Sequence, residues 1–112
     1  IDFDMAYGHR NDAIGFGRAL EEFDAWLPQL CEKMQPEDLL VISADHGCDP
    51  TTPGSDHPRE YVPVLAWSKS MQEGISLGDR KTFADLGATL AEYFGVSGRG
   101  DGRKRAVTVY SR

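Results

Sequence analysis

Each of the three histidines in this chain follows closely behind an aspartate. The pairs are Asp4 with His9, Asp45 with His46, and Asp56 with His57. Carboxylate oxygens and imidazole nitrogens are the ligands that Zn, Mn and Fe prefer, whereas a calcium site uses oxygens alone. A single histidine in a loop is more often a solvated residue or a helix cap, but the repetition of the pattern favours a metal site.

The number of candidate ligands exceeds what one tetrahedral ion needs. Two ions about 3.5–4 Å apart use such a surplus, because together they hold the attacking and leaving oxygens of a phosphoryl transfer. Neighbouring side chains of a strand point to opposite faces, so Asp45 and His46 reach one site only where the chain bends, at Gly47. The pattern therefore predicts a two-metal site suited to phosphate chemistry.

The elements that position these residues are predicted from the periodicity of the apolar residues. Alternating apolar and acidic residues predict a strand over 1–5. An apolar stripe predicts a helix over 12–34 that Asp12 caps and Pro28 kinks. The apolar run 39–44 predicts a strand that is buried on both faces of a parallel sheet.

The second half of the chain continues with a loop, a strand and a helix. The loop over 45–59 is rich in Gly, Pro, Asp, Ser and Thr, and a third strand is predicted over 62–67. A second amphipathic helix begins at Thr82 and ends before Gly95, a suitable residue for the C′ position. Every candidate ligand thus lies at the carboxyl end of a predicted strand or in the following loop, where open α/β sheets bind ligands.

The composition restricts the class of protein. A length of 112 residues fits one small domain, and 40% hydrophobic residues supply a core. No apolar run approaches the roughly 20 residues that span a bilayer, and no charged-then-apolar leader opens the chain. With only two cysteines, we expect a cytoplasmic protein. Residues 98–112 carry a net charge of +4 and residues 1–97 carry −10. The acidic charge of residues 1–97 suits a cation site and disfavours nucleic acid as a partner.

Several motifs resemble a known family. Ser43-Ala44-Asp45-His46-Gly47 is similar to the metal-binding signature of the alkaline phosphatase superfamily. Within that superfamily, four further segments resemble the phosphopentomutase family, and the resemblance covers about residues 1–95. These segments are 2–10, 45–51, 54–60 and 83–95.

The resemblance implies an α/β fold, namely a partial alkaline-phosphatase-like core with a mainly parallel sheet and flanking helices. Residues 1–95 would then be the carboxyl-terminal part of this metal-binding core domain, and residues 96–112 a basic tail. Because the chain opens on Ile1 inside a predicted strand, we expect it to be a fragment of a longer enzyme.

The resemblance also implies a reaction and a cofactor. Members of the family interconvert the 1- and 5-phosphates of ribose or deoxyribose with two Mn ions, through a phosphothreonine and a bisphosphorylated intermediate. The threonine and the cap domain that binds the pentose phosphate precede Ile1 in the family pattern, so we expect no catalytic nucleophile here and no turnover from this chain alone. Asp45 and His46 would hold one ion together with an aspartate that precedes Ile1 in the family pattern, and Asp4, His9 and His57 would hold the other.

Alternative interpretations remain open from the sequence. One alternative is that the chain is a non-catalytic metal-binding or partner-binding fragment. Another is that it is part of a different metal-dependent phosphomutase or phosphatase of the superfamily. Arg10 and Arg59 either bind phosphate or form ion pairs with carboxylates such as Glu60. Cys48 is interpreted as inert, although it lies in the metal loop, residues 45–59, and the basic residues 99–105 as a solvated tail rather than a nucleic-acid site.

Overall fold

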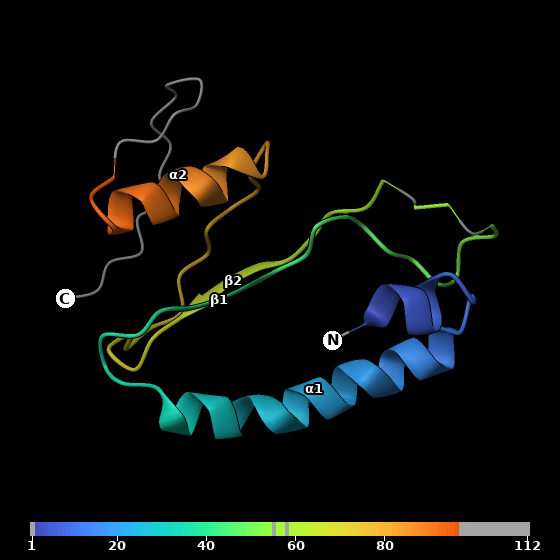
Figure 1. Cartoon of the computed structure of the whole chain (residues 1–112), viewed down its shortest axis with the longest axis horizontal. Coiled ribbons are helices and arrows are strands. Elements are labelled where there is room, and N and C mark those ends of the chain that lie inside the picture. Colours follow the sequence, from blue (N-terminus) through green and yellow to red (C-terminus); the bar gives the residue numbers. More distant parts are fainter. Residues whose placement is uncertain (1, 55, 58, 97–112) are drawn as a thin grey trace. The chain divides into compact units, whose positions relative to one another are not determined.

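A computed structural model describes residues 2–54, 56–57 and 59–96. The chain divides into two compact units, Ile1–Lys69 and Ser70–Arg112. All candidate metal ligands lie in the first unit. In chain order the elements are a helical turn η1 (Asp4–Gly8), helix α1 (Ala13–Lys33), strands β1 (Leu40–Ser43) and β2 (Val64–Trp67), and helix α2 (Ala84–Tyr93) (Figure 1).

Helix α1 forms where the apolar stripe predicts it, one residue shorter at each end. The Asp12 side chain accepts a hydrogen bond from the backbone N–H of Gly15 at 2.8 Å and so caps the first turn. The chain becomes extended at Met34, and Pro36 keeps the helix from resuming because proline disfavours helical geometry in the residue before it, Gln35. The start of α1 therefore has a fixed position directly after the segment that carries Asp4 and His9.

Strands β1 and β2 lie within the predicted ranges, and the mixed α/β class is confirmed. Their pairing is antiparallel, with Leu40 opposite Trp67 and Ser43 opposite Val64, so the prediction of a parallel sheet is wrong for this pair (Figure 1). Parallel neighbours need a crossover connection, usually a helix. The described residues between the two strands contain no helix, so β2 returns alongside β1 in the opposite direction.

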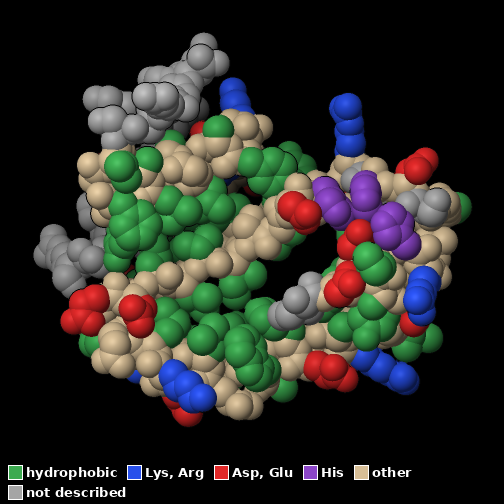
Figure 2. Space-filling model, viewed as in Figure 1, with side chains coloured by type: hydrophobic (Ala, Val, Ile, Leu, Met, Phe, Trp, Pro, Cys, Tyr) green, Lys and Arg blue, Asp and Glu red, His purple; other side chains and the backbone are tan. Residues whose placement is uncertain are grey.

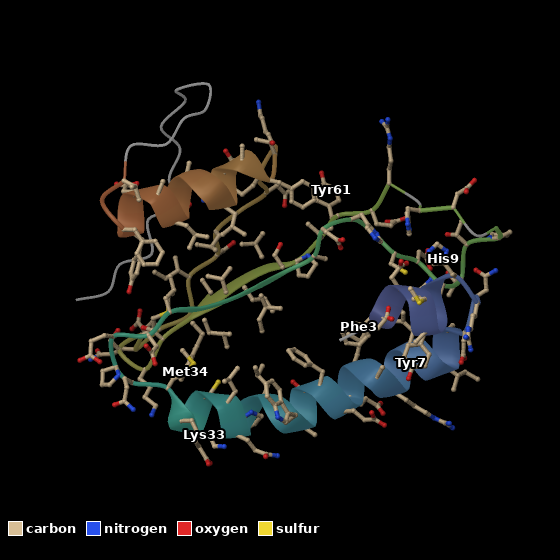
Figure 3. All side chains as sticks on the ribbon, in the orientation of Figure 1. Phe3, Tyr7, His9, Lys33, Met34 and Tyr61 are labelled. Carbon is tan, nitrogen blue, oxygen red and sulfur yellow. The ribbon has the colours of Figure 1, made fainter. Side chains whose placement is uncertain are left out.

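The predicted strand over 1–5 is wrong, because the described residues of this segment form the helical turn η1 instead. The Asp2 side chain accepts a hydrogen bond from the backbone N–H of Met5 at 3.0 Å, which favours the turn. The Phe3 ring packs against Phe16 and Phe23 of α1, with ring centroids 5.6 and 6.5 Å apart. Figure 3 shows Phe3 on the side of η1 nearest α1, so an apolar anchor fixes η1 on the helix.

The apolar faces of α1 and the sheet are only partly covered. Among the described apolar residues, Met34 alone is buried, with 8% of its surface still exposed. A cavity of about 390 Å³ lies between α1 and the sheet, and its lining includes Leu27, Ile42, Leu65 and Trp67. Stability of the first unit therefore rests on partial burial together with the local hydrogen bonds of its turns.

The second unit contains α2, as the second amphipathic stripe predicts. The Thr82 hydroxyl accepts a hydrogen bond from the Ala84 N–H at 3.3 Å, and Gly95 has a left-handed φ of 64° at the carboxyl end. None of the helices in the described residues is long and apolar enough to cross a membrane. The predicted boundary at residue 95 stays a prediction, and residues 97–112 of the predicted tail lie outside the described residues.

Candidate metal centre

The carboxylate of Asp4 lies at the centre of the three histidines. Its Oδ2 atom is 3.2 Å from His9 Nε2 and 3.9 Å from His46 Nε2, and its Oδ1 atom is 3.6 Å from His57 Nδ1. Figure 2 shows the histidines as one continuous patch with acidic side chains beside it. Residues that are more than fifty positions apart in the chain therefore meet around one carboxylate, as the sequence pattern predicts.

His9 reaches Asp4 because of the geometry of η1. The backbone N–H of His9 donates to the carbonyl of Asp4 at 2.9 Å, which is the five-residue hydrogen bond of a π-helical turn. Figure 3 shows His9 on the side of η1 away from α1. At the preceding residue, Gly8, a Cβ atom would come within 2.5 Å of Cys48 Sγ and 3.1 Å of Asp4 Oδ1. A glycine is therefore required for η1 and the metal loop to approach each other.

His46 is oriented by its own loop. Its Nδ1 atom lies 2.9 Å from the carbonyl oxygen of Gly47, so Nδ1 carries the proton and the lone pair of the neutral ring is on Nε2, the atom near Asp4. The hydrogen bond to Gly47 raises the pKa of the His46 imidazole above its usual value. Asp45 and Asp4 add to this rise in pKa, and partial desolvation opposes it. An orienting carbonyl of this kind is typical of a metal-binding histidine.

His57 enters the cluster from the far end of the loop that follows β1. Its ring centroid is 3.8 Å from that of His46 and 5.0 Å from that of His9. Earlier in this loop, Asp49 accepts hydrogen bonds from the hydroxyl groups of Thr51 and Thr52, at 2.6 and 3.0 Å. The hydrogen bond from the Thr51 hydroxyl is the main cause of a lowered pKa of the Asp49 carboxyl. The Thr51 backbone N–H and the Thr52 hydroxyl lower this pKa further. These hydrogen bonds fix a turn at the start of the loop.

The residues present fit a divalent metal ion. Asp4, His46 and His57 each offer a ligand atom, and the three atoms lie within 4.8 Å of one another. Asp4 Oδ1 is shielded from solvent and has no hydrogen-bond partner among the described residues. A buried acceptor without a donor is costly, and a cation beside it would remove that cost. One carboxylate and two imidazoles are a donor set that zinc, manganese and iron accept.

The division of the ligands between two ions stays a prediction. The three-residue cluster joins Asp4 and His57, expected on one ion, with His46, expected on the other. The Asp45 side chain is 92% exposed, and its Oδ1 atom lies 3.8 Å from His46 Nε2, so it borders the cluster on the solvent side. Asp56 is exposed and lies outside the three-residue cluster.

Two further residues near the cluster are Asn11, which the residue pattern does not single out, and Cys48, which it does. Asn11 has a left-handed φ of 51°, and its position directly before the helix cap Asp12 was the only available signal. Cys48 lies close to Gly8, and burial raises the pKa of its thiol, with further increases from Asp4 and Asp49. The interpretation of Cys48 as inert stays a prediction.

Gly47 permits a close approach between two parts of the loop, and we expect its replacement to be destabilising. A Cβ atom at this position would lie 2.8 Å from the backbone nitrogen of Glu60 and 3.0 Å from its Cα. Gly47→Ala should therefore lower the free energy of unfolding by about 1–3 kcal/mol, as overpacking does. It should also weaken metal binding, since the Gly47 carbonyl orients His46. Urea unfolding and a Mn²⁺ titration measure the two effects.

Gly17 in α1 provides the matched control for Gly47. A Cβ atom at Gly17 would meet nothing within 4 Å, and the residue lies inside a helix. Gly17→Ala should therefore raise the free energy of unfolding by about 0.5–1 kcal/mol and leave metal binding unchanged. Equal urea midpoints for Gly47→Ala and the unmodified chain would show that the loop does not need this close approach.

Comparison with known proteins places this fold and cluster in a class. The family model of the Metalloenzyme superfamily matches residues 1–98, so the chain belongs to that superfamily. The prediction of an alkaline-phosphatase-like metalloenzyme, made from the motif at 43–47, is confirmed. Metal binding is therefore supported both by the family and by the cluster around Asp4.

The curated relatives include phosphopentomutases from several bacteria. The chain is 62% identical over 96 residues to the phosphopentomutase of Caldanaerobacter subterraneus subsp. tengcongensis. The aligned residues make up 86% of this chain and 24% of the relative. It is 58% identical over 96 residues to that of Carboxydothermus hydrogenoformans, covering 86% and 25%. It is 55% identical over 103 residues to that of Desulfitobacterium hafniense, covering 92% and 26%. The chain thus spans about a quarter of the length of these relatives.

Proposed function

We propose that this chain is the metal-binding part of a phosphopentomutase, an isomerase that interconverts the 1- and 5-phosphates of ribose or deoxyribose. The observation that carries the proposal is the meeting of all three histidines around the carboxylate of Asp4. Identity of 55–62% to phosphopentomutases, over nearly all of the chain, supports the same reaction. The substrate is then a pentose phosphate held by a cap domain outside these residues, and the reaction takes place in the cytoplasm.

The proposed cofactor is a pair of divalent ions, with Mn²⁺ as the expected metal. Asp4, His9 and His57 hold one ion, and Asp45 and His46 contribute to the other. Asp4 has one oxygen toward His57 and the other toward His9 and His46, so its carboxylate faces ligands assigned to both ions. Bound divalent ions neutralise charge on the oxygens of a transferred phosphoryl group and lower the pKa of an attacking hydroxyl.

Backbone and side-chain groups of this chain position the metal ligands that such chemistry requires. The Gly47 carbonyl keeps the proton of His46 on Nδ1, so that Nε2 is available as a ligand. The turn η1 holds His9 and Asp4 at 3.2 Å, which makes them a preformed pair. Preformed ligands bind a metal with less loss of conformational entropy than ligands on a disordered segment.

A chimeric enzyme tests this proposal directly. The 96 matched residues of the Caldanaerobacter relative are replaced by the corresponding residues of this chain. We expect the chimera to convert ribose 1-phosphate to ribose 5-phosphate in Mn²⁺, and the 112-residue chain alone to show no turnover. The matched control is the same chimera carrying Asp4→Asn, which should be inactive. A chimera that folds and binds Mn²⁺ but has no mutase turnover would contradict the proposal.

A further inference from the structure

Asn11 occupies a fixed backbone position between η1 and α1. Its φ of 51° is left-handed, a conformation that asparagine tolerates better than most residues with a side chain. The Asn11 backbone N–H donates to the Gly8 carbonyl at 3.0 Å, and the next residue, Asp12, donates to the Tyr7 carbonyl at 3.0 Å. Hydrogen bonds at two successive residues therefore fix where the Asn11 side chain leaves the backbone.

The Asn11 side chain faces two carbonyl groups of the metal loop. With its nitrogen directed toward them, the amide donates to the Gly54 carbonyl oxygen at 3.1 Å and to the Thr52 carbonyl oxygen at 3.3 Å. The reverse orientation would place the amide oxygen against two other acceptors, so the donating orientation is assigned. One side chain thus joins the η1–α1 junction to the loop that continues to His57.

This connection matters because His57 is the ligand that depends most on loop geometry. Gly54 precedes His57 by three residues and has a left-handed φ of 108°. The hydrogen bonds of Thr51 and Thr52 to Asp49 join residues within the start of the loop. Asn11, in contrast, attaches the loop to the segment that carries His9. The His9 and His57 rings, whose centroids are 5.0 Å apart, lie on the two segments that Asn11 joins.

We propose that Asn11 is a positioning residue that holds residues 52–54 against the η1–α1 junction and thereby places His57 beside Asp4. The inference rests on the proposed metal site, because its consequence is a preformed ligand for a divalent ion. Asn11 itself does not need to touch the ion. It acts through His57, so the loss of its amide has an effect only while the His57 imidazole is present.

A purely conformational role for Asn11 makes a different prediction. If asparagine were needed only for its left-handed φ, glycine would replace it without loss. Asn11→Gly keeps this backbone geometry and removes both amide hydrogen bonds. Asn11→Asp keeps the size of the side chain but turns a carboxylate toward two carbonyl oxygens. We expect both variants to displace the loop, Asn11→Asp more strongly because like partial charges face each other.

The first readout uses the full metal-free chain. Nuclear Overhauser contacts between the ring protons of His9 and His57 are expected in the unmodified chain and should be lost in Asn11→Asp and Asn11→Gly. Absence of these contacts in the unmodified chain, or their persistence in both variants, would overturn the inference. Because no metal is present, this result is independent of the proposed function.

The second readout is the affinity for Co²⁺, measured by absorption titration of the full chain. Asn11→Asp should weaken binding about tenfold, as loss of a partner that orients a ligand does. In a His57→Ala background the same substitution should have little further effect, since coupled residues are not additive. An undiminished Asn11→Asp effect in that background would show that Asn11 does not act through His57. Failure of the unmodified chain to bind Co²⁺ would contradict the proposed metal site, while the ring contacts still decide the role of Asn11.

Discussion

Asp4→Asn is expected to lower the affinity of the chain for Mn²⁺ by more than about 100-fold, the upper end of what loss of an outer-shell partner costs. The substitution removes the negative charge that lies less than 4 Å from a nitrogen of each histidine. It also turns an amide N–H₂ group toward atoms that bind metal, and such a group cannot act as a ligand. Competition with a metal-binding dye at constant pH measures the change.

Asp2→Asn is the matched control for this substitution. Asp2 is exposed, lies two residues before Asp4 and loses the same charge, while an amide oxygen can still accept the hydrogen bond from Met5. We expect its Mn²⁺ affinity to remain close to that of the unmodified chain. If both substitutions weakened binding equally, the effect of Asp4 would be one of general charge and not of coordination.

In the complete enzyme, His57→Ala is expected to remove one of two bound Mn²⁺ ions. The imidazole belongs to the three-residue cluster with Asp4 and His46, and no other ligand approaches from that end of the described loop residues. The free energy of unfolding should change by less than about 0.5 kcal/mol, because His57 is exposed and lies outside the core elements. Elemental analysis after equilibrium dialysis at limiting Mn²⁺ gives the count.

Asp56→Ala tests whether the loss is specific to the imidazole. Asp56 is the exposed neighbour of His57 in the same loop, outside the three-residue cluster. This variant should retain the metal content of the unmodified chain. Unchanged metal content in His57→Ala would instead remove His57 from the ligand set and leave Asp56 and His57 as ordinary loop residues.

Local signals in the sequence were sufficient to predict α1 and the positions of the two strands. The start of α1 depends on Asp12, whose side chain caps the helix whatever packs around it. The apolar runs of β1 and β2 likewise show where strands form. They do not show how the strands pair, because direction depends on the connecting chain and on neighbours that the run itself does not specify.

The turn η1 shows where a short pattern fails. Five alternating residues are compatible with a strand, but the Phe3 ring packs on Phe16 and Phe23, and the Asp2 side chain favours a turn. Packing onto α1 overrides the alternation, as tertiary contacts often do in short segments. The length of the alternating segment gave no means to distinguish the two structures.

The members of the candidate site were more predictable than their arrangement. The repeated pairing of aspartate with histidine identified Asp4 and its histidine partners without any structure. The central position of Asp4 depends on a π-helical turn, and the approach of the loop depends on Gly8, Gly47 and Asn11. These are consequences of backbone geometry and of contacts between distant segments, which residue spacing does not encode.

The most direct test of the metal centre is to add Mn²⁺ to the unmodified chain and follow the ring-proton signals of its histidines by NMR. Mn²⁺ is paramagnetic and broadens the signals of nearby nuclei, and the chain has only three histidines. We predict that substoichiometric Mn²⁺ broadens the signals of His9, His46 and His57 together, because all three lie around Asp4. The indole signal of Trp26 on α1 should stay sharp. Broadening of none of the three histidines, or of a single one alone, would contradict a shared metal centre.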